Sequence, residues 1–169
     1  SKITQGVTTE ITGEGSAIAP VTDKMIAEEL SGQATHYKVV VDWHSLSEYF
    51  ARLELRTHPA INVGTFVGAG GVREYVVGKE DRPATPAELA AMKKLVAQAM
   101  EQGALGLSSS LQYVPDRFAT TDELVELAKT AASYGGIYIT HQRSESGKIV
   151  ESLDEVFAIA ERAKIPAEI

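Results

Sequence analysis

The 169-residue sequence contains no cysteine. This absence excludes disulfide bonds, thiolate nucleophiles and any metal site that depends on cysteine ligands. A metal ion bound by this chain must therefore be held by histidine and carboxylate side chains. Histidine is itself scarce, because the sequence contains four.

Long apolar runs and basic clusters are also missing. No stretch approaches the ~18 consecutive apolar residues of a membrane span, and the first residues lack the charged and apolar regions of a secretory leader. The net charge is −7, and no Lys/Arg cluster with interleaved aromatic residues offers a surface for phosphate groups. We therefore expect neither a membrane nor a nucleic-acid partner, and a cytoplasmic location.

The composition that remains is that of a globular domain. Hydrophobic residues make up 44% and charged residues 23% of the sequence, and the length suffices for one domain with a core. Short β-branched apolar segments, typical of strands, alternate with segments of helical periodicity. We expect strands over residues 7–12, 61–67, 104–108 and 137–140, and a further strand from residue 165.

Helix starts are marked by capping signals. Thr85 and Glu88 form a capping box with a proline between them, and Thr120 with Glu123 forms a second one. A third helix begins near Ser152. The side chains expected to face the core of these three helices are Leu89, Met92, Leu95, Val96 and Ala99; Leu124, Leu127, Ala128 and Ala131; and Leu153, Val156, Phe157 and Ala160.

The alternation of strands and helices from residue 61 onward predicts an α/β fold with a parallel sheet. Two architectures satisfy this pattern, a (β/α) barrel and a doubly wound open sheet. The first two strands are separated by ~50 residues, which indicates an insertion around residues 21–58 within a single domain spanning residues 1–169. The glycine cluster 68–71 is interpreted as a loop, and residues 73–82 as a polar connection.

Polar side chains that follow the strands are candidates for chemistry, because the carboxyl ends of parallel strands form the active-site mouth of a barrel. These candidates are Glu14, the 68–73 loop, Ser108 to Ser110, His141, Arg143 and Glu145. The other histidines, His36, His44 and His58, do not follow a strand. One histidine and one carboxylate make only two ligands, whereas a catalytic zinc normally has about three protein ligands and a water.

Three stretches, taken together, resemble a known family. They are Gly6-Val-Thr-Thr-Glu-Ile-Thr-Gly-Glu14-Gly, Gly103-Ala-Leu-Gly-Leu-Ser-Ser-Ser-Leu-Gln-Tyr113-Val-Pro and Tyr138-Ile-Thr-His141-Gln-Arg143-Ser-Glu145. The chain resembles the N-acyl-D-amino-acid deacylases, or D-aminoacylases, of the amidohydrolase superfamily. The resemblance implies a partial (β/α)8 barrel in which this chain supplies strands two to six, as an internal part of a longer enzyme.

The resemblance also implies a zinc site. His141 would be the metal ligand of the fifth strand, and Glu14 would stand where the family has a bridging ligand, often a cysteine. Alternatively, Glu14 is an ordinary loop residue and Glu10 lies inside the barrel. The family's catalytic aspartate, a general base, would lie beyond Ile169, so we expect no catalytic residue within this chain.

The implied substrate is an N-acyl-D-amino acid, which the parent enzyme would hydrolyse to a carboxylate and a free D-amino acid. Tyr113, Arg143 and Arg73 are the candidates for binding the substrate's carboxylate, since a phenol or a guanidinium can do so. Two of them have a structural alternative: Tyr113 as a packed loop residue, and Arg143 as the partner of Glu145.

Two other functions stay open. One is a different amidohydrolase acting on a cyclic amide or a dipeptide, although such enzymes usually carry a carboxylated lysine that no strand end here offers. The other is a non-catalytic β/α module that has lost its metal. A partial barrel would also leave two unpaired strand edges, which could mediate self-association.

Overall fold

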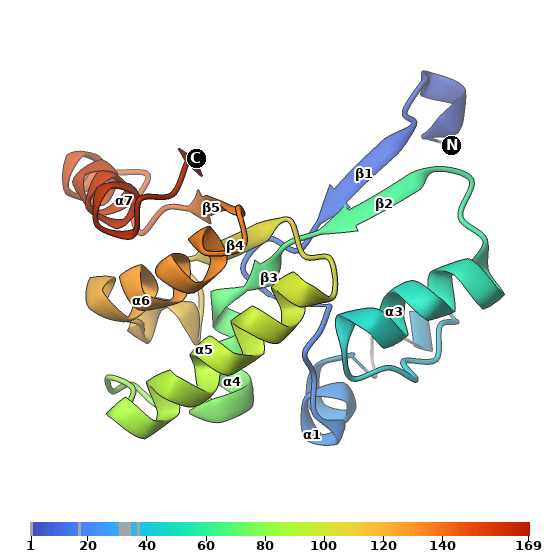
Figure 1. Cartoon of the computed structure of the whole chain (residues 1–169), viewed down its shortest axis with the longest axis horizontal. Helices are drawn as coiled ribbons and strands as arrows, with labels where there is room; N and C mark the ends of the chain where they lie inside the picture. The colour runs from blue at the N-terminus through green and yellow to red at the C-terminus, as the bar shows by residue number, and fades with distance from the viewer. Residues whose placement is uncertain (1, 17, 31–34, 37) are drawn as a thin grey trace.

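A computed structural model describes residues 2–16, 18–30, 35–36 and 38–169 (Figure 1). Its strands form two parallel sheets. In the first, β1 (Thr9–Thr12) pairs with β2 (Asn62–Thr65). In the second, the order is β3 (Val67–Gly68), β4 (Gly106–Ser110), β5 (Ile137–His141) and β6 (Ala167–Glu168).

The two sheets are joined in one continuous arc. Only Phe66 separates β2 from β3, and its backbone N–H donates to the Thr12 carbonyl at 2.9 Å, while the Leu105 N–H donates to the Thr65 carbonyl at 3.0 Å. The predicted strand 61–67 is therefore observed as two strands. Among the strands that the structure describes, spatial order follows chain order, without the reversal that defines a doubly wound sheet. This singly wound order is the one found in (β/α) barrels.

Four helices cover one face of the larger sheet (Figure 1). They are α4 (Ala69–Val76), α5 (Pro86–Glu101), α6 (Thr121–Ala132) and α7 (Ile149–Ala163), and each packs against the next along the chain. The core lies between these helices and the strands. Leu107, Tyr138 and Leu127 are among its fully buried side chains. The predicted apolar faces of α5 and α6 are confirmed, with Leu89 and Leu95 partly buried against this core.

The two capping signals differ in outcome. The Thr85 hydroxyl accepts a hydrogen bond from the Glu88 N–H, and the Glu88 carboxylate accepts one from the Thr85 N–H, so the first capping box is confirmed. Thr120 accepts from the Glu123 N–H at 3.2 Å. The Glu123 carboxylate, however, binds Arg73 instead of closing the box.

Three other expectations were wrong in detail. The strand predicted over residues 104–108 is β4, two residues later, so the serines of the 108–110 run lie within the strand. Phe157 is 56% exposed, because Ser152, Val156 and Ile159 set the buried face of α7. The glycine cluster is not a loop: Gly68 ends β3, and residues 69–71 form the buried first turn of α4.

The segment between β1 and β2 contains α1 (Asp23–Met25), the π-helical stretch η2 (Ile26–Leu30), α3 (Leu46–Arg52) and a second π-helical stretch, η3 (Leu53–Thr57). Figure 1 shows α3 on the side of β2 opposite to α6 and α7. Within this segment, the Trp43 indole N–H donates to the Ile18 carbonyl at 3.0 Å. The π-helical stretch η3 ends at His58, whose φ is +47°. The identification of the segment between β1 and β2 as an insertion stays a prediction.

Among the described strands, β1 and β6 form the outer edges. Self-association through these edges stays a prediction. Within the described residues, no helix has both the length and the apolar character needed to cross a membrane.

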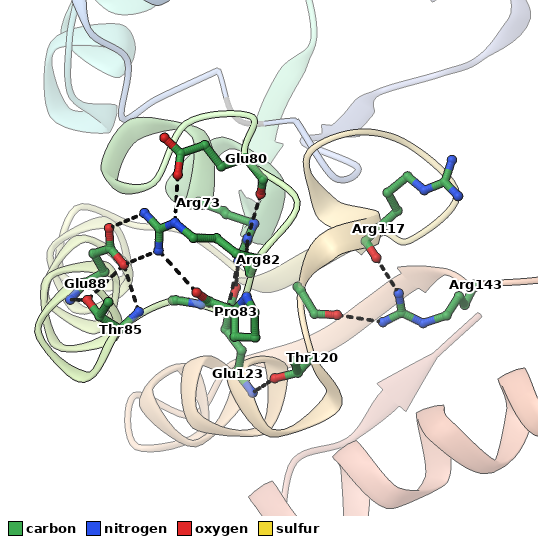
Figure 2. Close-up of polar contacts among 12 residues, drawn as sticks. Arg73, Glu80, Arg82, Pro83, Thr85, Glu88, Arg117, Thr120, Glu123 and Arg143 are labelled. Atoms are coloured by element: carbon green, nitrogen blue, oxygen red, sulfur yellow. Dashed lines mark hydrogen bonds and ion pairs between the residues drawn. The ribbon is translucent and has the colours of Figure 1, made fainter.

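A fully buried ion pair locks α4 to α6. The Arg73 guanidinium is 0% exposed, and its Nη1 donates to both Glu123 carboxylate oxygens at 2.8 Å. Its Nη2 donates to the carbonyls of Glu80 and Arg82, as Figure 2 shows. Residues 73–76 are thus helical rather than a polar connection. The expected role of Arg73 in binding a substrate carboxylate gains no support from this geometry, because its side chain is enclosed by these partners, and it stays a prediction.

Replacing Arg73 with alanine should lower the free energy of unfolding by about 3–5 kcal/mol, because it leaves the buried Glu123 carboxylate without its partner. The matched control is Arg162→Ala, which removes the exposed Arg162–Asp122 pair. We expect that change to cost at most about 1 kcal/mol. Urea denaturation measures both values, and similar small losses would contradict a desolvated Arg73 pair.

Candidate functional site

His141 lies at the carboxyl end of β5, on the sheet face opposite to the helices. Side chains alternate along a strand. Tyr138 and Thr140 are buried toward the helices, while Ile139 and His141 are half-buried on the other face. Ser110, the last residue of β4, is the register partner of His141. The strand-end position predicted for His141 is confirmed.

The turn that carries Glu14 is held tightly against the neighbouring strands. Gly13 and Gly15 both have positive φ, +96° and +65°. A Cβ at Gly13 would lie 2.5 Å from the Phe66 carbonyl oxygen, and one at Gly15 would lie 2.2 Å from the Ser110 Cβ. The Ser108 hydroxyl accepts from the Gly15 N–H at 3.1 Å and donates to the Gly13 carbonyl. Only glycine at positions 13 and 15 permits the turn to lie this close to Phe66 and Ser110.

The structure brings Glu14 and His141 together. The Nδ1 of His141 lies 3.2 Å from a Glu14 carboxylate oxygen, and its Nε2 lies 3.3 Å from a Glu145 carboxylate oxygen. The Tyr113 ring meets the imidazole edge-on, with 5.5 Å between ring centroids. Glu10, the alternative carboxylate, is instead paired with Lys2. One imidazole is therefore flanked by two carboxylates and a phenol-bearing ring.

A cavity of about 340 Å³ opens beside Glu14. It lies between the turn after β1, the first turn of α4 and the loop after β4. Tyr113, which is 59% exposed, lines it together with Ser110 and Asp116. The phenol of Tyr113 therefore adjoins both the cavity and the imidazole, and its role in binding substrate stays a prediction.

Asp116 is a site residue that sequence reasoning missed. It begins the short 3-10 helix η4 (Asp116–Phe118) and is 2% exposed. Its Oδ2 accepts from the Ser110 N–H at 2.6 Å, whereas its Oδ1 has no partner among the described residues. Burial raises the pKa of Asp116 to about 7, although the Ser110 N–H and Arg143 act in the opposite direction. No sequence signal distinguishes this residue from an ordinary loop aspartate after a proline.

Arg143 fastens two site loops to each other. Its Nε and Nη2 donate to Glu155 at 2.8 and 2.9 Å. Arg143 also donates to the carbonyls of Arg117, as Figure 2 shows, and Ala119, at 2.9 and 3.0 Å. The Glu155 carboxylate raises the pKa of Arg143 above its usual value. The partner is thus Glu155 rather than Glu145. With its donors directed at these groups, Arg143 positions the loops, and this geometry gives no support to substrate binding.

Comparison with known proteins identifies relatives, although no family model matches the chain. The chain is 35% identical to a D-aminoacylase from Alcaligenes xylosoxydans xylosoxydans, over 99% of this chain and 34% of the relative. An N-acyl-D-aspartate deacylase and an N-acyl-D-glutamate deacylase of the same organism are 33% and 32% identical, over 94% and 95% of this chain.

Solved structures agree with these sequence relatives. A crystal structure of D-aminoacylase, described as defining a novel subset of amidohydrolases, matches 98% of this chain with a TM-score of 0.83 and 32% identity. An N-acyl-D-glutamate deacylase from Bordetella bronchiseptica, complexed with zinc and a phosphonate inhibitor, matches 99% of it with a TM-score of 0.83 and 28% identity.

The chain is a homologue of the D-aminoacylases. It spans about a third of the length of the curated relatives that it matches. Its parallel α/β arc corresponds to part of the D-aminoacylase amidohydrolase fold, in agreement with the family predicted from the sequence motifs. One of the matching D-aminoacylase structures concerns a binuclear metal centre.

The geometry around His141 fits part of a zinc site. Two ligands bonded to zinc at a tetrahedral angle lie about 3.3 Å apart, which is close to the 3.2 Å between His141 Nδ1 and Glu14. Glu145 is placed to fix the second imidazole nitrogen, as carboxylates do for metal-bound histidines. Within the described residues, however, no group of three or more His, Asp or Glu side chains could hold a metal ion. His141 and Glu14 are therefore two candidate ligands, and their role stays a prediction.

Gly15→Ala should displace the turn that carries Glu14 and destabilise the fold more than the control Gly78→Ala. Both glycines have positive φ, but a Cβ at Gly78 would meet nothing within 4 Å. Gly78→Ala should therefore cost only the ~1–2 kcal/mol of a left-handed alanine. Gly15→Ala should cost about 1–3 kcal/mol more, because its Cβ overlaps Ser110. Chemical denaturation measures the difference, and equal losses would show that the turn is not held by this contact.

Asp116 should make the folded state less stable as the pH rises toward neutrality. Its carboxyl is protonated in the folded state up to about pH 7, whereas in the unfolded chain it ionises near pH 3.9. The stability that it contributes is fully present below pH ~4 and is lost as the pH rises to ~7, a change on the order of 4 kcal/mol.

The measurement compares the wild type with Asp116→Asn, which retains an acceptor for the Ser110 N–H. Between pH 4 and 7 the free energy of unfolding of the wild type should fall relative to that of the variant. Carboxylates with lowered pKa, such as Glu126 at about 2, change stability in the opposite direction but equally in both proteins. Parallel pH profiles would contradict a buried, neutral Asp116.

Proposed function

We propose that this chain is part of a zinc-dependent enzyme that hydrolyses the amide bond of N-acyl-D-amino acids and releases a carboxylate and a D-amino acid. The observation that carries the proposal is the approach of His141 and Glu14 at the carboxyl edge of the sheet, where barrel enzymes place their chemistry. Homology to D-aminoacylases supports this substrate class.

In this proposal His141 binds zinc through Nδ1, and Glu14 supplies a carboxylate ligand. Glu145 accepts a hydrogen bond from Nε2 and so holds the imidazole in one tautomer and orientation. A bound zinc supplies an activated water at neutral pH and polarises a carbonyl oxygen. The tight turn formed by Gly13, Glu14 and Gly15 holds the Glu14 carboxylate near the metal position, so little conformational entropy is lost on binding.

Tyr113 is the proposed substrate-binding residue. Its ring adjoins both His141 and the cavity, so its hydroxyl can donate a hydrogen bond to a carboxylate of a substrate whose amide lies at the metal. Arg143 supports this geometry indirectly, because it fixes the loop that carries Tyr113 to the loop after β5.

The described strands are proposed to be strands two to six of an eight-stranded barrel, with residues 21–58 as an insertion. The general base is proposed to be an aspartate outside these 169 residues. A dihydroorotase-like or dipeptidase-like site has less support, since none of the described strands ends in a lysine that could be carboxylated.

In the protein expressed from its complete coding sequence, His141→Ala should remove zinc and activity together. We expect at least about a 100-fold fall in kcat/KM for N-acetyl-D-amino acids, since the metal contributes several kcal/mol to catalysis. The control is His44→Gln, which alters an exposed histidine that pairs with Asp23. Metal content comes from atomic absorption and turnover from released D-amino acid.

Retention of zinc and turnover in the His141 variant would refute the ligand assignment. A wild-type protein that binds zinc but releases no D-amino acid from any N-acyl substrate would refute the deacylase function. A wild-type protein that binds no zinc would instead indicate a non-catalytic module.

A further inference from the structure

The cavity beside Glu14 is lined by apolar side chains on one part of its wall and by polar side chains on the other. One part is apolar and includes Ile18, Val21 and Met25, which come from the segment after β1. The other part carries hydroxyl and carboxyl groups. None of the described residues that line it is a lysine, an arginine or a histidine. An anionic group entering the cavity would therefore find no side-chain cation to compensate its charge.

The three carboxyl groups of the wall are not equivalent. Glu14 is paired with His141, and Glu74 with Lys79 at 3.4 Å. Among these three, Asp116 is distinguished by a buried carboxyl oxygen, Oδ1, with no partner among the described residues. A buried acceptor without a donor is unfavourable unless a ligand or water completes it.

The Asp116 carboxyl group packs closely against a small residue, Gly70. A Cβ at Gly70 would lie 3.0 Å from the Asp116 Cγ, so a side chain there would press on the carboxyl group. The Ser110 N–H fixes the other carboxyl oxygen at 2.6 Å. The carboxyl is thus held rigidly among residues of the cavity wall, between the first turn of α4 and the end of β4.

We propose that this cavity binds a primary alkylammonium group, with the ammonium on the Asp116 carboxyl and the alkyl stem along Ile18, Val21 and Met25. An ammonium donates three hydrogen bonds and accepts none, which suits a wall with carboxyl and hydroxyl acceptors. Alkyl stems of this kind pack favourably along apolar surface while the charged end is paired.

The consequence for substrate choice rests on the proposed function. Because the cavity adjoins Glu14 and Tyr113, it would receive the side chain of a substrate held at the metal. Substrates with an aminoalkyl side chain, such as N-acyl-D-ornithine or N-acyl-D-lysine, would be preferred over N-acyl-D-aspartate and N-acyl-D-glutamate. Two of the relatives are named for those acidic substrates.

The direct test is binding, which needs neither metal nor turnover. Titration of the zinc-free protein with n-butylammonium chloride, sodium butyrate and n-butanol, followed by calorimetry, separates charge recognition from apolar binding. We expect saturable binding of butylammonium and none of butyrate. At a pH above the Asp116 pKa of about 7 the carboxyl is ionised, and Asp116→Asn should then weaken butylammonium binding by about 30-fold or more, as loss of a buried charged partner does. Asp122→Asn removes the same charge from an exposed position and should leave the affinity unchanged.

Equal binding of all three probes, or no binding of butylammonium, would overturn the proposal. Should Asp116→Asn fail to fold, the wild-type protein still decides: butylammonium and not butyrate should shift the Ser110 amide signal in a ¹H–¹⁵N spectrum. The deacylase function is tested separately with N-acetyl-D-alanine. Failure of the ammonium-binding proposal would therefore not refute the deacylase function, nor the reverse.

Discussion

The hydroxyl of Ser108 holds the candidate site together. It binds both ends of the turn that carries Glu14, accepting from the Gly15 N–H and donating to the Gly13 carbonyl, across more than 90 residues of sequence. Because Ser108 is in β4, and β4 pairs in register with β5, the turn after β1 is placed relative to His141 by the sheet itself. Disturbing this contact would separate the two groups that could share a metal.

Two arginines complete the frame, and each is bound to backbone carbonyls as well as to a glutamate. Arg73 joins α4 to α6, and Arg143 joins the loop after β5 to the loop after β4. Both were expected to bind substrate, since a guanidinium can grip a carboxylate. The same planar geometry makes arginine suited to joining neighbouring segments, and here its charge is compensated by a buried glutamate, Glu123, or a partly buried one, Glu155.

Much of the fold was predictable because local signals agreed with the tertiary arrangement. The Thr85 capping box, the stripes of α5 and α6 and the strand before His141 are patterns of a few residues, and packing did not override them. Predictions failed where a distant partner intervened. Glu123 left its capping box for Arg73, and the glycines after β3 began a helix because α4 must approach Asp116 closely.

The sequence by itself determined the class of the chain: a parallel α/β arrangement, a site without cysteine ligands, and motifs that point to D-aminoacylases. Only the tertiary structure decided which polar residues meet. It paired His141 with Glu14 and Glu145, paired the two arginines with Glu123 and Glu155, and buried Asp116 against Ser110 and Gly70. The reason is physical. Periodicity indicates which face of an element is buried, whereas a contact such as that between Glu14 and His141, which are 127 positions apart, depends on strand register and on the space that other loops leave.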